Sequence, residues 1–205
     1  MPPPPDEFDP DVLTLEAGTL LYRVCSNARR VTDFNPGVGS PTRFAFFGDP
    51  VVPVLYAAQS RKAALAESLL HDIPLSGGIL TYDDYGSSVM GRIETTKDLR
   101  LASFMGLGLR RLKVHPDHLT DTEASEYPHT VRWAQAAHRA GFDGLVWMSR
   151  RCNSDRAYVL FGDRVGESGI GQDDTFGMLF ESGSGFDWLV DTCAPLRVDV
   201  MPPSH

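Results

Sequence analysis

The chain has 205 residues, 42% of them hydrophobic, which is enough to bury the core of one domain. Its formal net charge of -8 argues against a DNA or RNA surface, because phosphate binding requires clustered Lys and Arg. The three cysteines are widely spaced and lack the Cys and His spacing of a metal site, so we expect reduced thiols, no disulfide framework and no metal.

The first residues contain four successive prolines, which neither a helix nor a central strand accommodates. We therefore predict a disordered Pro-rich lead-in over 1–11 and a folded domain over 12–162. The start of the chain lacks a basic region followed by an apolar one, so we expect no signal peptide. No run of about 18 apolar residues occurs, and we expect a cytoplasmic protein without membrane contact.

Short apolar segments rich in β-branched residues predict the first strands, at 20–24 and 51–57. Between them, residues 35–41 combine Asn, Pro, Gly and Ser, which indicates a mobile loop.

The segment 60–71 is the clearest helix, because Ser60 is suited to cap its N-terminus. Its leucines recur at the helical spacing, so that face is expected to pack on the core. Glu67 falls on the other side, one turn after Ala63 and Ala64, whose small side chains leave room beside the carboxylate. An ordinary solvated glutamate is the alternative interpretation.

The rest of the chain mixes strands and helices. Further strands are predicted at 78–82, 88–94 and 99–104, a second helix at 130–140 with Gly141 as its C-terminal cap, and a strand pair at 145–148 and 157–161. This mixture predicts an α+β fold in a single domain. From 163 to 187 the composition shifts to Gly, Ser and Asp, which predicts irregular structure. We expect 163–205 to be a C-terminal appendage of the same domain.

Four segments each place a polar or aromatic side chain at the edge of an apolar stretch, where it can point into a cleft. They are Leu20-Leu21-Tyr22-Arg23-Val24, Thr42-Arg43-Phe44, Leu55-Tyr56-Ala57 with Ala64-Leu65-Ala66-Glu67, and Phe142-Asp143-Gly144 through Met148-Ser149. A surface salt bridge or a solvent-facing side chain is the alternative at any single position. Together the segments indicate a binding site.

In order and flanking residues, these segments resemble the RES domain family, named for its Arg, Glu and Ser, over roughly residues 19–162. Arg23, Glu67 and Ser149 match the three residues of the family name, and Tyr56 matches the strand tyrosine. The family contains toxins of RES-Xre toxin-antitoxin systems, and its fold is similar to that of NAD-dependent ADP-ribosyltransferases. The resemblance implies mixed or antiparallel sheets with flanking helices.

The resemblance further implies that NAD⁺ is the substrate and that its nicotinamide-ribose bond is cleaved without a metal. Cleavage leaves positive charge at C1 of the ribose, and Glu67 is the group expected to stabilise that charge or to hold a ribose hydroxyl. Arg23 and Arg43 are the candidates for the pyrophosphate, because a planar guanidinium binds two oxygens at once.

An aromatic side chain is needed to hold the nicotinamide ring. Tyr56 is the first candidate, with Tyr22 and Phe44 as further wall residues, and Ser149 is expected to orient a ribose or a carboxylate. One departure is that many family members read Arg-Trp-Asn where this chain reads Arg43-Phe44-Ala45, a change in a loop expected to meet the substrate.

Several alternatives remain open. The acceptor of the ADP-ribosyl group is water or phosphate in a degradative enzyme, and a protein side chain in a mono-ADP-ribosyltransferase. A non-enzymatic binding module with a vestigial cleft is a further interpretation. A cysteine hydrolase built on Cys25 lacks a local signature. Gly37-Val38-Gly39 lacks the third glycine of a dinucleotide-binding loop, so no Rossmann fold is expected.

The resemblance also implies a partner. An enzyme that consumes NAD⁺ harms its own cell, so we expect a neutralising Xre-like helix-turn-helix antitoxin in a hetero-oligomer with this chain. The acidic composition fits a division in which the partner contacts DNA and this chain does not bind nucleic acid directly.

Overall fold

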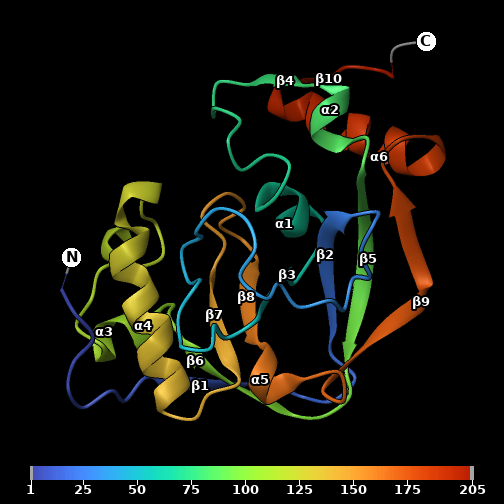
Figure 1. The fold of residues 1–205 in the computed structure, drawn as a ribbon. Coiled ribbons are helices and arrows are strands. Elements are labelled where there is room, and N and C mark those ends of the chain that lie inside the picture. The colour runs from blue at the N-terminus through green and yellow to red at the C-terminus, as the bar shows by residue number, and fades with distance from the viewer. Residues whose placement is uncertain (1, 204–205) are drawn as a thin grey trace.

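The computed structural model describes residues 2–203, within which one mixed sheet of eight strands forms the frame (Figure 1). Its strands are β1 (Asp11–Leu15), β2 (Leu20–Ser26), β3 (Val54–Ala58), β5 (Ser88–Thr95), β6 (Leu99–Ser103), β7 (Gly144–Met148), β8 (Arg156–Phe161) and β9 (Ile170–Leu179). The spatial order is β1-β6-β7-β8-β3-β2-β5-β9. Neighbouring strands are antiparallel, except that β6 and β7 are parallel.

The helices are α1 (Arg61–Ala66), α2 (Tyr82–Tyr85), α3 (Leu107–Arg111), α4 (Tyr127–Arg139), α5 (Gly162–Val165) and α6 (Gly183–Cys193). A small parallel sheet joins β4 (Gly78–Leu80) to β10 (Val198–Val200). In Figure 1, α3 and α4 lie near the N-terminus, whereas α2, α6, β4 and β10 gather at the end where the C-terminus lies. Within residues 2–203, no helix has the length and apolarity needed to cross a membrane.

The hydrophobic core lies on both faces of the central strands. The apolar runs of β7 and β8 are almost completely buried, as expected for strands covered on both sides. The helix α4 buries Thr130, Trp133, Ala134 and Ala137, which recur at the helical spacing and pack on the sheet. The predicted α+β architecture in one domain with a mixed sheet is confirmed.

Several predicted elements occur with shifted ends. The second helix begins at Tyr127 and stops before Gly141, whose positive φ of 88° is the conformation expected after a helix end. The first helix is shorter than predicted and ends at Ala66, because the chain leaves the helical path there and the Ser68 hydroxyl donates to the Ala64 carbonyl at 2.6 Å. Glu67 is consequently the C-cap residue of α1 and lies where the helix ends.

The prediction of irregular structure over 163–187 is wrong. That segment contains most of α5, the whole of the edge strand β9 and the beginning of α6. Polar residues dominate β9 because most of its side chains are exposed or half-buried at the sheet edge, so its composition resembles that of a loop. The C-terminal segment is therefore part of the sheet and of its cover, and the term appendage does not describe it.

From Pro2 to Pro10 the described part of the Pro-rich lead-in has no helix or strand, as its prolines predict, but it packs against the core. The ring of Phe8 meets the rings of Phe104 and Trp133 edge-on, each with centroids 6.4 Å apart. Arg111 of α3 pairs with Asp9. Phe8 and Asp9 therefore connect this segment to the core and to α3.

Candidate functional site

The main sheet opens between β2 and β3, which share a single cross-strand pair, Tyr22 with Ala58. Each of the two strands is fully paired on its other side, β2 with β5 and β3 with β8. A cleft of about 570 Å³ lies at this opening. It is lined by β2, by β3, by the C-terminal end of α1 and by the segment 40–43. A split between two anchored strands gives a preformed site with rigid walls.

The floor of the cleft is a row of side chains that runs across four strands. Tyr22 pairs with Ala58, Ala58 with Ala157, and Ala157 with Trp147, so all four point to one face of the sheet. All four line the cleft. The two central alanines have small side chains that leave room above the middle of the floor. The aromatic rings of Tyr22 and Trp147 border this room on either side. The floor is therefore suited to a flat ligand group.

Glu67 and Ser149 meet at one wall of the cleft. The Ser149 hydroxyl donates to Glu67 Oε1 at 2.5 Å, and the same oxygen of Ser149 accepts the backbone N–H of Cys152 at 3.0 Å. Glu67 lines the cleft, whereas Ser149 is fully buried behind it. Ser149 therefore holds the Glu67 carboxylate in place from behind the cleft lining, and its predicted catalytic role stays a prediction.

Arg23 also lines the cleft, but part of its guanidinium is used by the chain itself. Its Nη1 donates to the backbone carbonyls of Val31 and Asp33, both at 2.7 Å. Burial lowers the pKa of Arg23 from its ordinary value, and the neighbouring Cys25 and Asp33 oppose that shift. Arg23 thus stabilises the turn after β2 through its Nη1, and its remaining N–H groups are available to a ligand.

Arg43 is buried in the opposite wall. Its Nη2 donates to the Thr122 carbonyl at 3.3 Å, and its guanidinium lies 5.8 Å from the ring centroid of Tyr127. Arg150 donates to the same Thr122 carbonyl at 3.0 Å and pairs with Glu123 at 2.7 Å. Two arginines therefore hold the segment before α4, and Tyr127 from that region lines the cleft beside Arg43.

The Tyr56 hydroxyl holds the segment that carries Arg43. It shares a hydrogen bond of 2.8 Å with the Thr42 hydroxyl and accepts the backbone N–H of Phe44 at 3.1 Å. Burial raises the pKa of Tyr56 to about 12, so the phenol is neutral at physiological pH. The ring lines the cleft, but the hydroxyl is committed to this structural role.

The predicted wall residue Phe44 lies outside the cleft. Its side chain is completely buried and packs against Phe104 and Trp147 in the core. Its assignment as a binding residue is therefore corrected, and the aromatic wall consists of Tyr22, Tyr56 and residues that the sequence analysis missed. The missed lining residues include Thr42, His71, Tyr127 and Trp147. The sequence around Trp147 has the pattern of an apolar strand, in which a tryptophan is expected to be an ordinary core residue.

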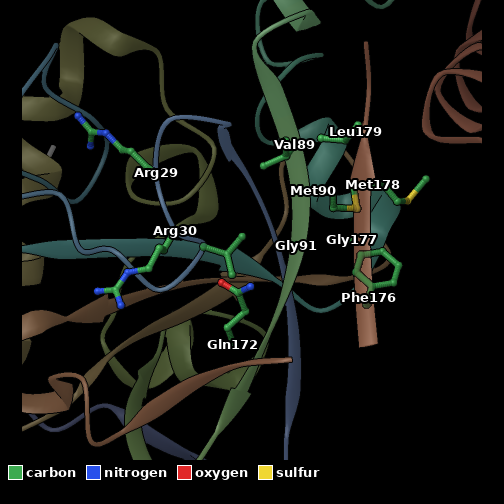
Figure 2. Close-up of a pocket in the computed structure, with 11 residues that line it drawn as sticks. Arg29, Arg30, Val89, Met90, Gly91, Gln172, Phe176, Gly177, Met178 and Leu179 are labelled. Carbon is green, nitrogen blue, oxygen red and sulfur yellow. The ribbon is translucent and has the colours of Figure 1, made fainter. Parts of the chain in front are cut away.

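A second hollow lies at the β5 and β9 edge of the sheet (Figure 2). It is bordered by Arg29 and Arg30 from the turn after β2 and by apolar residues of β9. Figure 2 shows Phe176 and Met178 projecting from β9 on the side away from the two arginines. Arg30 already pairs with Asp33 at 3.1 Å. Because no carboxylate faces this hollow among its lining residues, the cleft between β2 and β3 is the better candidate.

The cleft combines groups suited to one kind of ligand. Two guanidinium groups fit an anionic group such as a pyrophosphate, and the aromatic floor fits a planar ring. Glu67 supplies a fixed carboxylate to the same cleft. Among residues 2–203, no cluster of His, Cys, Asp and Glu side chains is arranged to hold a metal ion. The lining of the cleft is chemically suited to a ligand that combines an anionic group with a planar ring.

The chain is similar to known proteins in its family and in its fold. A family model described as RES domain matches residues 20–177, so the match continues past residue 162 into β9. A chain in the crystal structure of the M. tuberculosis MbcT-MbcA toxin-antitoxin complex is similar with a TM-score of 0.57 and 14% sequence identity. That similarity covers 80% of this chain and 85% of the other, and it shows a shared fold. No curated protein matches the chain.

Proposed function

Because the chain belongs to the RES domain family, we propose that it is the toxin of a toxin-antitoxin pair and that it degrades NAD⁺. The observation that carries the proposal is the Glu67 carboxylate, which Ser149 fixes at the wall of a cleft that Arg23 and Arg43 also line. The similarity to a chain of a toxin-antitoxin complex supports it through the fold.

In the proposed reaction, the bond between the nicotinamide nitrogen and C1 of the ribose breaks. The electron pair of that bond stays with the nitrogen, so nicotinamide leaves as a neutral molecule and the ribose carbon becomes cationic. Glu67 stabilises this developing charge, and an electrostatic interaction of this kind lowers the barrier most when the group is held in place beforehand. The contact with Ser149 supplies that preorganisation.

Arg23 and Arg43 are proposed to bind the pyrophosphate. Each lines the cleft and is held at its back by a backbone carbonyl, which fixes the position of the positive charge. The floor between Tyr22 and Trp147 then receives the nicotinamide ring. Holding the pyrophosphate and the nicotinamide ring on either side of the nicotinamide ribose is proposed to place the scissile bond beside Glu67 and to reduce the entropic part of the barrier.

Water or inorganic phosphate is proposed to complete the reaction by attacking the ribose carbon. Attack by water gives ADP-ribose and releases one proton, and attack by phosphate gives the phosphate ester of ADP-ribose. The purified protein is incubated with NAD⁺, with and without phosphate, and the products are separated by chromatography. Nicotinamide is expected in at least one condition, and its absence from both contradicts the degradative function.

The same incubation distinguishes the alternatives. Transfer of radiolabel from NAD⁺ to a protein identifies a mono-ADP-ribosyltransferase in place of a degradative enzyme. Binding of NAD⁺ without any release of nicotinamide identifies a binding module with a vestigial cleft.

The proposed partner is an Xre-like helix-turn-helix antitoxin that covers the cleft. The walls offer Arg23 and Arg43 to an acidic group, so a carboxylate of the antitoxin can occupy the position proposed for the pyrophosphate. Neutralisation by occupation of the site requires no change in the fold of the toxin.

A further inference from the structure

Trp147 carries a hydrogen-bond donor that the rest of the described chain leaves unused. The residue is 2% exposed, and its Nε1 is buried without a hydrogen-bond partner within residues 2–203. A buried donor without a partner is destabilising, and native proteins rarely keep one unless a ligand or a water uses it. Because Trp147 lines the cleft, we propose that its indole N–H donates a hydrogen bond to an oxygen of the bound ligand.

The other buried tryptophan of the core shows what is unusual at this position. Trp133 is 1% exposed, and its Nε1 donates to the Pro2 carbonyl at 3.2 Å. Arg151 and Arg164 also have a buried Nε without a partner in residues 2–203, but each guanidinium carries further N–H groups. The indole N–H is the single polar group of the Trp147 side chain, so no second donor compensates for it.

The surroundings hold the indole in place. The rings of Phe44 and Tyr56 meet it edge-on, with centroid distances of 5.0 and 6.1 Å. Its cross-strand neighbour Ala157 has a small side chain and lines the cleft as well. The Tyr56 hydroxyl is already bonded within the protein, so Trp147 is the donor that this end of the floor still offers.

The chemistry of the donor selects the class of ligand group. An indole N–H is neutral and lies among apolar rings, which suits a neutral carbonyl oxygen better than a phosphate, and the two arginines already serve an anion. This step rests on the proposed function. In NAD⁺ the group that fits is the carboxamide oxygen of the nicotinamide ring, so Trp147 is a specificity-determining residue for that oxygen.

The test compares NAD⁺ with its thionicotinamide analogue, in which sulfur, a weak acceptor, replaces the carboxamide oxygen. Dissociation constants are measured by calorimetry on the Glu67→Gln protein, so that turnover does not interfere. One hydrogen bond corresponds to about tenfold in affinity, so NAD⁺ is expected to bind about ten times more tightly than the analogue. Adding Trp147→Phe removes the donor and is expected to bring this ratio close to one.

Trp133→Phe is the matched control, because it removes a buried indole N–H that lies outside the cleft lining, and the tenfold ratio is expected to persist. If Trp147→Phe leaves the ratio of the two dissociation constants unchanged, the assignment is overturned. A ratio near one in the protein that keeps Trp147 also overturns it. This second outcome does not depend on whether the Trp147→Phe variant folds. If neither dinucleotide binds while Trp147 is present, the proposed function itself fails. Binding with an unchanged ratio refutes the role of Trp147 alone.

Discussion

The contact between Glu67 and Ser149 joins two positions that are 82 residues apart in the chain. A carboxylate at the end of a short helix has several staggered rotamers, and the hydroxyl selects one of them. The chemistry of the cleft therefore depends on a buried serine that does not line it.

Ser149→Ala is expected to lower kcat about tenfold and to change KM little. The Glu67 carboxylate loses the donor that orients it, and a hydrogen bond to a charged group contributes about 1.5–3 kcal/mol. Steady-state kinetics of nicotinamide release measures both parameters. The Cys152 N–H also loses its acceptor, so a melting curve must accompany the kinetics. Unchanged kcat in a folded variant removes Ser149 from the positioning of Glu67.

Tyr56→Phe is expected to lower the free energy of unfolding by about 1–2 kcal/mol at neutral pH, because the hydroxyl holds Thr42 and Phe44. The folded-state pKa of Tyr56 is raised from 10.0 to about 12. The contribution of the neutral phenol is therefore complete below about pH 10 and is lost as the pH rises through about 12.

Melting temperatures of the parent and of Tyr56→Phe, measured from pH 7 to pH 11, test this expectation. Their difference should stay constant up to about pH 10 and decrease above it. A difference that disappears by pH 8 shows that the Tyr56 hydroxyl is ionised far below the expected pH.

At the residue scale, most of the residues predicted for the site line the cleft, but their individual roles could not be derived from the sequence. Arg23, Tyr56 and Glu67 line the cleft as expected. Phe44 lies in the core because residue type alone does not reveal on which side of a tight turn a side chain falls. Trp147 was missed because an aromatic residue in an apolar strand has the same pattern whether it faces a core or a cleft.

At the scale of elements, β9 supports the wall of the cleft from behind. Its ladder with β5 shifts register around Arg92, so residues 173–176 bulge out of the strand. Arg92 pairs with Asp173 at 2.6 Å and lies 5.1 Å from the ring centroid of Phe176. Phe176 in turn meets the ring of Tyr22 edge-on at 5.4 Å. Through Phe176, the bulge of β9 therefore supports Tyr22, which is a residue of the cleft floor.

Asp173→Asn is expected to raise KM for NAD⁺ about threefold or more while kcat stays nearly constant, because a looser Tyr22 weakens binding of the ring and leaves Glu67 in place. The pKa of Asp173 is lowered from 3.8 to about 2, mainly by its hydrogen bonds with Thr175 and then by Arg92. The bulge contacts are accordingly present above about pH 4 and are lost as the pH falls through about 2.

Asp174→Asn is the matched control, because this neighbouring carboxylate contacts Gln172 and does not contact Arg92 in the described structure. Steady-state kinetics of both variants at neutral pH measure whether Asp173→Asn raises KM for NAD⁺ more than Asp174→Asn does. An equal effect of the two substitutions on KM contradicts a specific link from Asp173 to Tyr22.

The errors in the predicted elements have a common physical origin. The strand pair of β7 and β8 and the helix α4 were predictable because continuous burial and helical periodicity are visible in a single sequence. The edge strand β9 was not, because one exposed face and a bulge remove the apolar alternation. The end of α1 depends on contacts of Glu67 and Ser68 that no local pattern shows.

At the scale of the whole molecule, the chain combines a net charge of -8 with a cleft that two arginines line. The surface as a whole repels polyanions, so an anionic ligand is attracted only where the local arginines face it. A small dinucleotide or a single acidic segment of a partner meets this condition, and an extended nucleic acid does not.

Expression of this chain alone is expected to arrest growth and to lower cellular NAD⁺, and expression together with the neighbouring antitoxin is expected to restore both. The physical reason is that the proposed antitoxin would occupy the cleft and exclude the dinucleotide. Growth curves and NAD⁺ levels in the same cultures provide the measurement, with Glu67→Gln as the inactive control. Normal growth with a steady NAD⁺ level during expression of the chain alone contradicts the toxin function.

The most direct measurement for the cleft as a site of NAD⁺ cleavage is the initial rate of nicotinamide release by the purified parent protein and by Glu67→Gln at saturating NAD⁺. The substituted amide keeps an oxygen that accepts the Ser149 hydroxyl, so the fold and the wall of the cleft are preserved. Loss of the negative charge is expected to reduce the rate by at least about a hundredfold, with an unchanged melting temperature. Equal rates for the two proteins contradict the role of Glu67, and the absence of nicotinamide from the parent reaction contradicts cleavage of NAD⁺ in this cleft.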